Sequence, residues 1–212
     1  MNPTAKERVV NWPAQRDKFS LEGVDLSGAD LSRVDLRGAN LAMANLAGAN
    51  LEYADLSHSI MNGTNLDKAR LAFADLSNAS MEGATLRGAD LTGANFSHAV
   101  LLAANLTGAI AHAGFYKANM TGVNLSLANC DGAEFHAAIM ESADLTGASL
   151  CGTWLVSANL VRACFKGANL DGANLGNANL WNTDLTDASL KHVNFNFAFP
   201  LGRSMLEGFP HE

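Results

Sequence analysis

The sequence predicts an all-β solenoid, a chain wound into stacked coils, and three observations lead to this fold class. From Phe19 to Phe195 a large apolar residue, mostly Leu, recurs at every fifth position, beginning with Leu21. The residue two places before it is small and mostly Ala, and the residue between them is mostly Asp or Asn. A period of five residues fits neither the period of about 3.6 of a helix nor that of about two of a strand.

Each five-residue unit is therefore expected to end at a corner of the chain. Four units close a square coil of 20 residues, and the coils stack at the spacing of β-strands, about 4.8 Å. The central apolar residues point to the axis and fill it, which leaves room for only a small residue two places earlier. Gly, Asn, Asp and Ser suit the corners and the outer surface. About nine such coils account for residues 19–198.

The stacking of like residues supports a coil of this length. We name the faces A, B, C and D after their first central residues, Leu21, Leu26, Leu31 and Leu36. All the methionines at central positions then fall on face A, namely Met61, Met81, Met120 and Met140. Face D carries a phenylalanine in three consecutive coils, at Phe96, Phe115 and Phe135. Cys130 is also a central residue, so we expect its thiol to be buried.

The repeat slips by one residue near residues 109–115. Ala109 and Ile110 stand where three residues are expected, and Ile110 takes the central position before the pattern resumes at Phe115. One interpretation is a tolerated deletion that bends one edge, as a β-bulge does. The other is a recognition site formed by His112, Tyr116 and Lys117. The first is favoured because no catalytic group surrounds the slip.

Both ends of a solenoid expose its core and an unpaired edge, so caps are expected. Residues 1–18 are predicted to form an N-terminal cap, helical after Asn2-Pro3 and ended by Pro13. Residues 199–212 are predicted to form a C-terminal cap or a dimer contact. The residues that support this are too apolar for a free tail: Phe197, Phe199, Leu201, Met205, Leu206 and Phe209.

Units such as ADLTG and ANLTG resemble the pentapeptide-repeat family, whose units read A(D/N)LXX, and the resemblance covers residues 19–198. It implies a right-handed quadrilateral β-helix. Some members mimic B-form DNA and inhibit or protect DNA gyrase, which gives fluoroquinolone resistance. These members tend to have Phe at the centre, strongly acidic faces and a C-terminal dimer contact. A few Leu-centred members are implicated in regulation through protein contacts.

The composition of the chain excludes several classes of function. The chain has 21 acidic and 14 basic residues, a net charge of −7, which disfavours binding of phosphate backbones. No apolar run is long enough to span a membrane, and the first twenty residues lack the apolar segment of a secretory signal. Three cysteines fit a reduced, cytoplasmic compartment. No metal-ligand spacing and no phosphate-binding loop occurs, so we expect no cofactor and no enzymatic activity.

The outward residues are the remaining candidates for a function. Acidic charge is spread evenly over the four faces, and the one local ladder is Asp35, Asp55 and Asp75 on face D. Outward apolar residues concentrate on face A, with an extension around the corner from face D: Met43, Ile60, Val100, Leu102, Ile139, Val161 and Trp181, then Trp154 and Val156. They either form an interface or merely support strand pairing.

These observations predict a non-enzymatic module that presents flat faces to a protein partner. The partner is expected to contact face A. The chain itself is expected to be a monomer, or a homodimer joined at its C-terminal end. The alternative is a DNA mimic that acts on gyrase.

Overall fold

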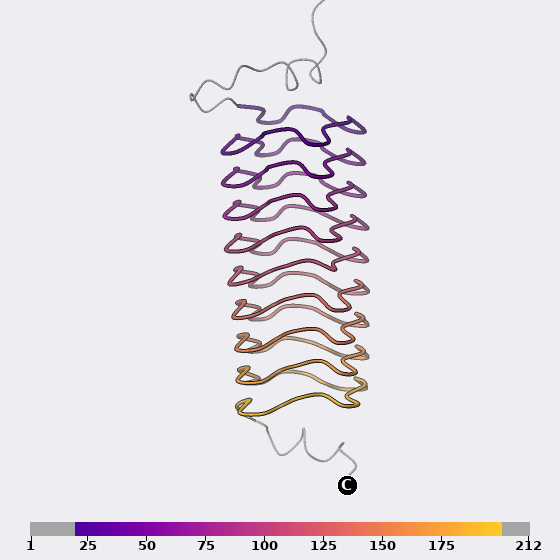
Figure 1. Cartoon of the computed structure of the whole chain (residues 1–212). Coiled ribbons are helices and arrows are strands. Elements are labelled where there is room, and N and C mark those ends of the chain that lie inside the picture. Colours follow the sequence, from indigo (N-terminus) through magenta and orange to yellow (C-terminus); the bar gives the residue numbers. More distant parts are fainter. Residues whose placement is uncertain (1–19, 201–212) are drawn as a thin grey trace, which may run out of the picture.

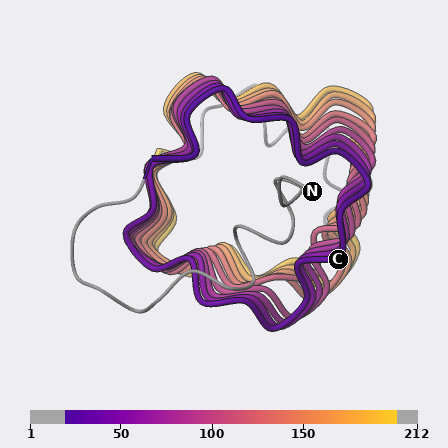
Figure 2. The same cartoon turned by 90° about the horizontal axis from the view of Figure 1, so that it is seen from above.

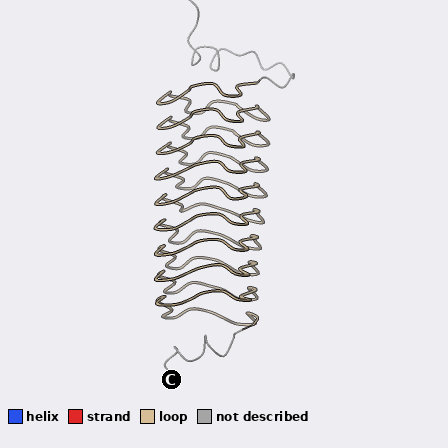
Figure 3. Cartoon of the chain, turned by 180° about the vertical axis from the view of Figure 1, so that it is seen from behind, coloured by secondary structure: helices blue, strands red, loops and turns tan. Residues whose placement is uncertain are grey.

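A computed structural model describes residues 20–200 of the chain (Figure 1). These residues contain no helix, and thus none that could cross a membrane, and no strand longer than a single bridge (Figure 3). Each residue that precedes a central residue forms one parallel bridge with the equivalent residue of the next coil. The bridges line up in four ladders along the molecule, which is therefore a β-helical solenoid. Viewed from above, the coils superpose around one axis (Figure 2).

The spacing of the bridges gives the length of each coil. Bridged residues are 20 positions apart from Ser20↔Asn40 to Asp90↔Ile110. The separation in sequence falls to 19 residues for the bridges from Asn95↔Gly114 to Ile110↔Asn129. It returns to 20 residues at Gly114↔Glu134. One coil thus lacks a residue, yet every ladder continues through it. The handedness, the square section and the number of coils stay predictions from the sequence and the resemblance.

Backbone hydrogen bonds between coils run along the axis of the solenoid. The N–H of the central Leu26 donates to the carbonyl of Asn45 in the next coil (2.7 Å), and the N–H of Gly28 donates to that of Ala47 (2.9 Å). In the opposite direction, the N–H of Asn45 donates to the carbonyl of Val24 (2.9 Å). This pattern recurs from coil to coil, so nearly all backbone polar groups are satisfied without extended strands.

The axis is filled by the central residues, as expected. The central leucines from Leu36 to Leu180 and the four central methionines are fully buried. The rings of Phe96, Phe115 and Phe135 stack along face D, with centroids 5.0 and 4.8 Å apart. The predicted stacking of like residues is thereby confirmed. Burial also raises the pKa of the Cys130 thiol to about 12, so this cysteine is inert at neutral pH.

Each corner is a tight turn that explains the two positions after the central residue. The N–H of Ala29 donates to the carbonyl of Leu26 (3.0 Å), which closes a four-residue β-turn. Its third residue, Gly28, has a φ of 62°. A positive φ at that place alone is typical of a type II turn, which favours Gly. Several corners nevertheless carry other residues in this conformation, among them Met43, Tyr53 and Leu127.

The Asp or Asn before each central residue has a local structural role. Its side-chain oxygen accepts the backbone N–H two residues later, as Asp25 Oδ1 does from Ser27 (3.0 Å). This bond is the main reason why the pKa of the Asp25 carboxyl lies below its usual value. Asn residues also bridge successive coils, as when Asn45 Nδ2 donates to Asp25 Oδ1 (3.0 Å). The Asp/Asn preference of the repeat is therefore explained by turn formation and by coil stacking.

Two corner glycines allow the role of the turn to be tested. Gly83 and Gly93 have φ values of 65° and 68°. An added Cβ would meet nothing within 4 Å at Gly83, whereas at Gly93 it would lie 2.6 Å from the ring of Phe73. Gly83→Ala is expected to cost about 1 kcal/mol through the positive φ alone. Gly93→Ala should cost more, because the Phe73 ring must move; urea denaturation of both variants measures the difference. Equal costs would contradict the overlap.

The slip differs from the sequence prediction in one respect. Ile110 is not a central residue: it occupies the bridge position, paired with Asp90 and Asn129, and is 43% exposed. Ala111 is the central residue and is fully buried. The missing residue belongs to the corner that follows, where the N–H of Ala113 donates to the carbonyl of Ala111 (2.8 Å) in a three-residue γ-turn. The prediction was wrong because it required a large central residue.

The predicted caps fall mainly outside the described residues. This applies to the whole N-terminal cap and to Leu201, Met205, Leu206 and Phe209. Phe197 and Phe199 are described, and their side chains are 86% and 71% exposed. The central residues of the last described coil, Leu185, Leu190 and Phe195, are only partly buried. Whether this end is capped or dimeric stays a prediction.

Candidate interaction surfaces

In the described part of the chain, the candidate functional sites lie on the outer surface of the solenoid. The axis is filled by side chains, and no three His, Cys, Asp or Glu side chains within residues 20–200 lie close enough together to hold a metal ion. Cys151 and Cys164 are free thiols at partly exposed positions. The candidates are therefore ladders of outward residues and one shallow notch.

The apolar residues predicted on face A fall into two separate ladders. Ile60, Val100 and Ile139 lie on the bridge ladder, but Ser80 and Asn119 separate them. Leu102, Val161 and Trp181 lie on the ladder one position after the central residues, where the N–H of Arg162 donates to the carbonyl of Trp181 (2.8 Å). The structure therefore places only Val161 and Trp181 in successive coils. Trp181 is 54% exposed, so Val161 and Trp181 together form the main apolar patch of face A.

The remaining predicted residues lie apart from this pair. Met43 is at a corner in the N-terminal half, and its side chain covers Gly63 of the next coil. Trp154 lies on the bridge ladder of face D between Glu134 and Asn174, where its ring stacks on His136 (5.7 Å between centroids). Val156 is partly buried at the following corner. Trp154 is therefore a neighbour of Glu134 rather than a simple extension of face A.

The acidic ladder of face D is confirmed as a set of bridged neighbours, with Asp35 next to Asp55 and Asp55 next to Asp75. Arg37 pairs with the first two, at 2.7 Å from Asp35 and 3.4 Å from Asp55. A hydrogen bond from the Arg37 side chain is the main reason why the pKa of Asp35 lies below its usual value. The ladder is therefore partly neutralised, and it does not form a continuous row of free charges.

A column of rings along the corner after face C was not predicted from the sequence. Tyr53 and Phe73 stack with centroids 5.1 Å apart and are 49% and 54% exposed. The Arg33 guanidinium lies 4.8 Å from the Tyr53 ring centre. The signal in the sequence is the 20-residue spacing of these positions, which places them in one ladder along the axis.

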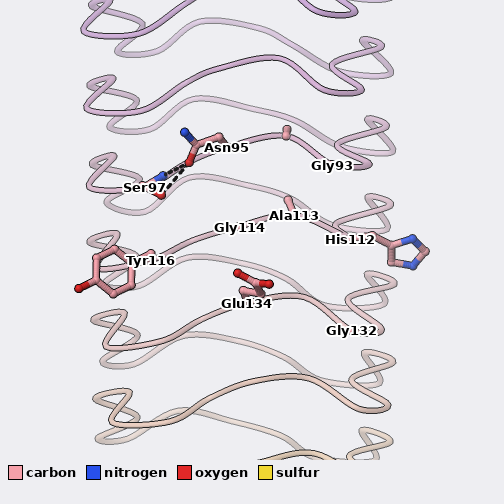
Figure 4. Close-up of a pocket in the computed structure, with 10 residues that line it drawn as sticks. Gly93, Asn95, Ser97, His112, Ala113, Gly114, Tyr116, Gly132 and Glu134 are labelled. Atoms are coloured by element: carbon pink, nitrogen blue, oxygen red, sulfur yellow. Dashed lines mark hydrogen bonds between the residues drawn. The ribbon is translucent and has the colours of Figure 1, made fainter.

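A shallow notch of about 370 Å³ opens on face D beside the slip (Figure 4). It spans the coil that lacks a residue, and Gly114 stands in the ladder between Asn95 and Glu134, where most coils have Asp or Asn. An added Cβ at Gly114 would meet no atom within 4 Å, so this step of the ladder is open space. Tyr116 and His112 lie at opposite ends of the notch, and Lys117 is not among the residues that line it.

Comparison with known families gives one match along the described chain. The family described as pentapeptide repeats matches with eight copies of its model, and the matched residues are 20–52, 44–88, 86–126, 113–150, 128–167 and 168–199. No curated protein matches the chain.

Several solved structures are similar. HetL, a pentapeptide repeat protein involved in heterocyst differentiation regulation from the cyanobacterium Nostoc sp., is 33% identical, over 84% of this chain and 85% of HetL, with a TM-score of 0.42. QnrB1, a plasmid-mediated fluoroquinolone resistance protein, is 18% identical, over 84% and 91% of the two chains, with a TM-score of 0.45. A pentapeptide repeat protein of the Arabidopsis thaliana thylakoid lumen is 31% identical, over 55% and 68%, with a TM-score of 0.23.

Proposed function

The chain belongs to the pentapeptide repeat family, and from this premise we propose that it is a non-enzymatic rod that presents face A to a protein partner. The rod is a right-handed quadrilateral β-helix of about nine coils. Its role is regulatory, exerted by binding and not by catalysis. We place it in the cytoplasm, in keeping with its three free cysteines.

The observation that carries this proposal is the pair formed by Val161 and Trp181. They occupy equivalent positions in successive coils, so their side chains share one flat ladder about 4.8 Å apart. A half-exposed Trp on a rigid surface is the kind of anchor that concentrates binding energy, because its large ring loses little conformational freedom. The equivalent positions of face B, at Lys166 and Thr186, carry polar side chains.

The regulatory part of the proposal is supported by the relationship to HetL, whose description places it in heterocyst differentiation regulation. The identity of 33% extends over most of both chains. The proposal takes from this relative only its class of role, a regulatory protein. The partner of the present chain is to be identified by experiment.

A double variant on face A tests the proposal. Val161→Asp combined with Trp181→Ala removes the anchor and adds one charge to the ladder, and at least a tenfold loss of captured partner is expected, roughly the effect of one interface hot spot. The measurement is affinity capture from the native host, quantified by mass spectrometry, with the unchanged protein and the double variant side by side.

The control is a double variant at the same corner position on face B, Thr146→Asp with Thr186→Ala. It makes the same change in net charge and leaves face A intact, so capture should equal that of the unchanged protein. If the control lost the partner and the face A variant kept it, face A would not be the interface. If no partner were enriched by the unchanged protein, the interaction role itself would be wrong.

The DNA-mimic alternative depends on the ladder of Asp35, Asp55 and Asp75. It requires inhibition of gyrase supercoiling, or protection of gyrase from quinolones, that weakens with salt and disappears when the three residues are changed to Asn. We expect neither effect, because Arg37 pairs with two of the three carboxylates. A supercoiling assay at micromolar protein distinguishes the two functions, and salt-sensitive inhibition would favour the mimic.

A further inference from the structure

The notch on face D is formed by two local changes that occur together. The γ-turn from Ala111 to Ala113 shortens one corner by a residue, so the edge is recessed there. The neighbouring ladder then lacks a side chain at Gly114, between Asn95 and Glu134. In a regular stack, adjacent rungs lie about 4.8 Å apart, so the missing side chain leaves a gap of two spacings, about 9.6 Å, between its neighbours. Such a gap admits one flat group from outside.

The charge at the notch selects the kind of group. Glu134 is the one acidic residue among those that line it, and no lysine or arginine does so; the basic residue His112 lies at the end opposite Tyr116. The Glu134 carboxylate makes no ion pair or hydrogen bond to another side chain of residues 20–200. Figure 4 shows the Glu134 carboxylate on the coil that follows Gly114, and Asn95 and Ser97 on the coil that precedes it, so Gly114 lies between them. The net charge of the whole chain, −7, also favours a cation.

One aromatic ring lines the notch, and a second lies one coil beyond Glu134. Tyr116 lines the notch and is 43% exposed, with the edge of His98 against it at 5.5 Å between centroids. Lys117 Nζ lies 5.1 Å from the centre of the Tyr116 ring, so a guanidinium that packs on this ring must displace the Lys117 ammonium. On the other side of Glu134, the next residue of the ladder is Trp154, 48% exposed.

We propose that the notch at Gly114 is a binding site for the guanidinium of an arginine from a protein partner, held by Glu134 and flanked by Tyr116. A guanidinium is planar, pairs with a carboxylate through two parallel hydrogen bonds, and packs on aromatic rings. The vacant rung matches that shape, and Glu134 supplies the complementary charge. That the arginine comes from a protein rests on the proposed function; the site itself lies on face D and does not depend on face A.

The site can be tested without the partner, using N-acetyl-arginine methylamide as the probe and NMR spectra of the isotopically labelled protein. Saturable shifts are expected at the amides of Gly114 and Glu134. The neutral citrulline analogue should bind more weakly, by up to about fivefold, the effect of losing one surface ion pair. Equal shifts with the two probes, or no saturable shift with either, would overturn the site. A lysine analogue that bound as tightly as arginine would overturn the assignment to guanidinium.

Two variants separate the charge from the shape of the notch. Glu134→Gln removes the carboxylate and should weaken arginine binding by up to about fivefold, while Glu82→Gln, an equal change on face A, should leave it unaltered. Gly114→Asn restores the usual ladder residue, fills the notch, and should abolish the shifts with the melting temperature maintained. Unchanged binding in either notch variant would contradict the proposal. If the unchanged protein captured its partner but did not bind the arginine probe, the notch alone would be disproved. If it bound the probe but captured no partner, the proposed function alone would be disproved.

Discussion

Replacing Leu145 with Asp is expected to unfold the solenoid around it, at a cost of about 4 kcal/mol or more. Leu145 is fully buried on the axis, where coils on both sides enclose it and none of the buried side chains of residues 20–200 is a cation that could pair with a carboxylate. Thermal melting followed by circular dichroism measures the effect. Because stacked repeats can unfold in parts, loss of the whole transition or its division into two steps both count as the expected result.

The control for this variant is the same substitution at Leu127, on the same face and one coil earlier. Leu127 is a corner residue, 69% exposed, with a φ of 58°. Asp tolerates this conformation better than Leu, so Leu127→Asp should change the free energy of unfolding by no more than about 0.5 kcal/mol. If Leu145→Asp melted within two or three degrees of the unchanged protein, the inward direction of the central residues would be wrong.

Phe115→Ala is expected to have the second largest effect, a loss of about 3–5 kcal/mol. Its ring is fully buried and stacks on Phe96 and on Phe135, so truncation leaves a cavity between two rings. Phe115→Leu supplies the usual central residue and should cost less, about 1–3 kcal/mol, because the smaller side chain still leaves some empty volume. Urea denaturation of the two variants gives the comparison, and a Phe115→Leu variant as stable as the unchanged protein would show that the stacked rings contribute no more than an ordinary leucine.

The special importance of Phe115 follows from the size of its neighbours in the same coil. The central residue of face C is Ala111 in this coil and Cys130 in the next, and both face D partners, Phe115 and Phe135, are large. A small residue on one side of the axis is matched by a large one on the adjacent side, which keeps the packed volume nearly constant. Phe115→Leu therefore leaves less material in this coil than a leucine does in the others.

The winding of the chain could be predicted from the sequence because every coil repeats the same local requirements. The spacing of Leu, Ala and Asp/Asn determines which residues are central, and the stacking of Met and Phe by itself indicates the coil length. Each requirement depends on contacts with the next coil only, so errors do not accumulate along the chain.

The details that the sequence did not predict all involve exceptions to the repeat. Ile110 is apolar and was assigned to the core, but backbone pairing with Asp90 placed it outside and left Ala111 in the centre. The notch depends on the γ-turn from Ala111 to Ala113. No residue in that corner is of a type that would predict a γ-turn. The column of Tyr53 and Phe73 obeys the 20-residue spacing but was missed because both rings stand at corner positions, where the repeat usually has Gly or a polar residue.

The direction of the hydrogen bonds between coils also sets the mechanical behaviour of the rod. Since they run along the axis, a force that pulls the two ends of the solenoid apart (Figure 1) loads every coil in series, and the bonds of the outermost coil, which has a neighbour on one side only, should break first. The rod should therefore peel from its ends under tension, releasing about 70 Å of extended chain per 20-residue coil. A force applied across the axis would instead be shared by many coils at once. The rod should thus resist a force across its axis better than a pulling force along it. A partner bound to one face can therefore be held firmly by a rod that unwinds from its ends under tension.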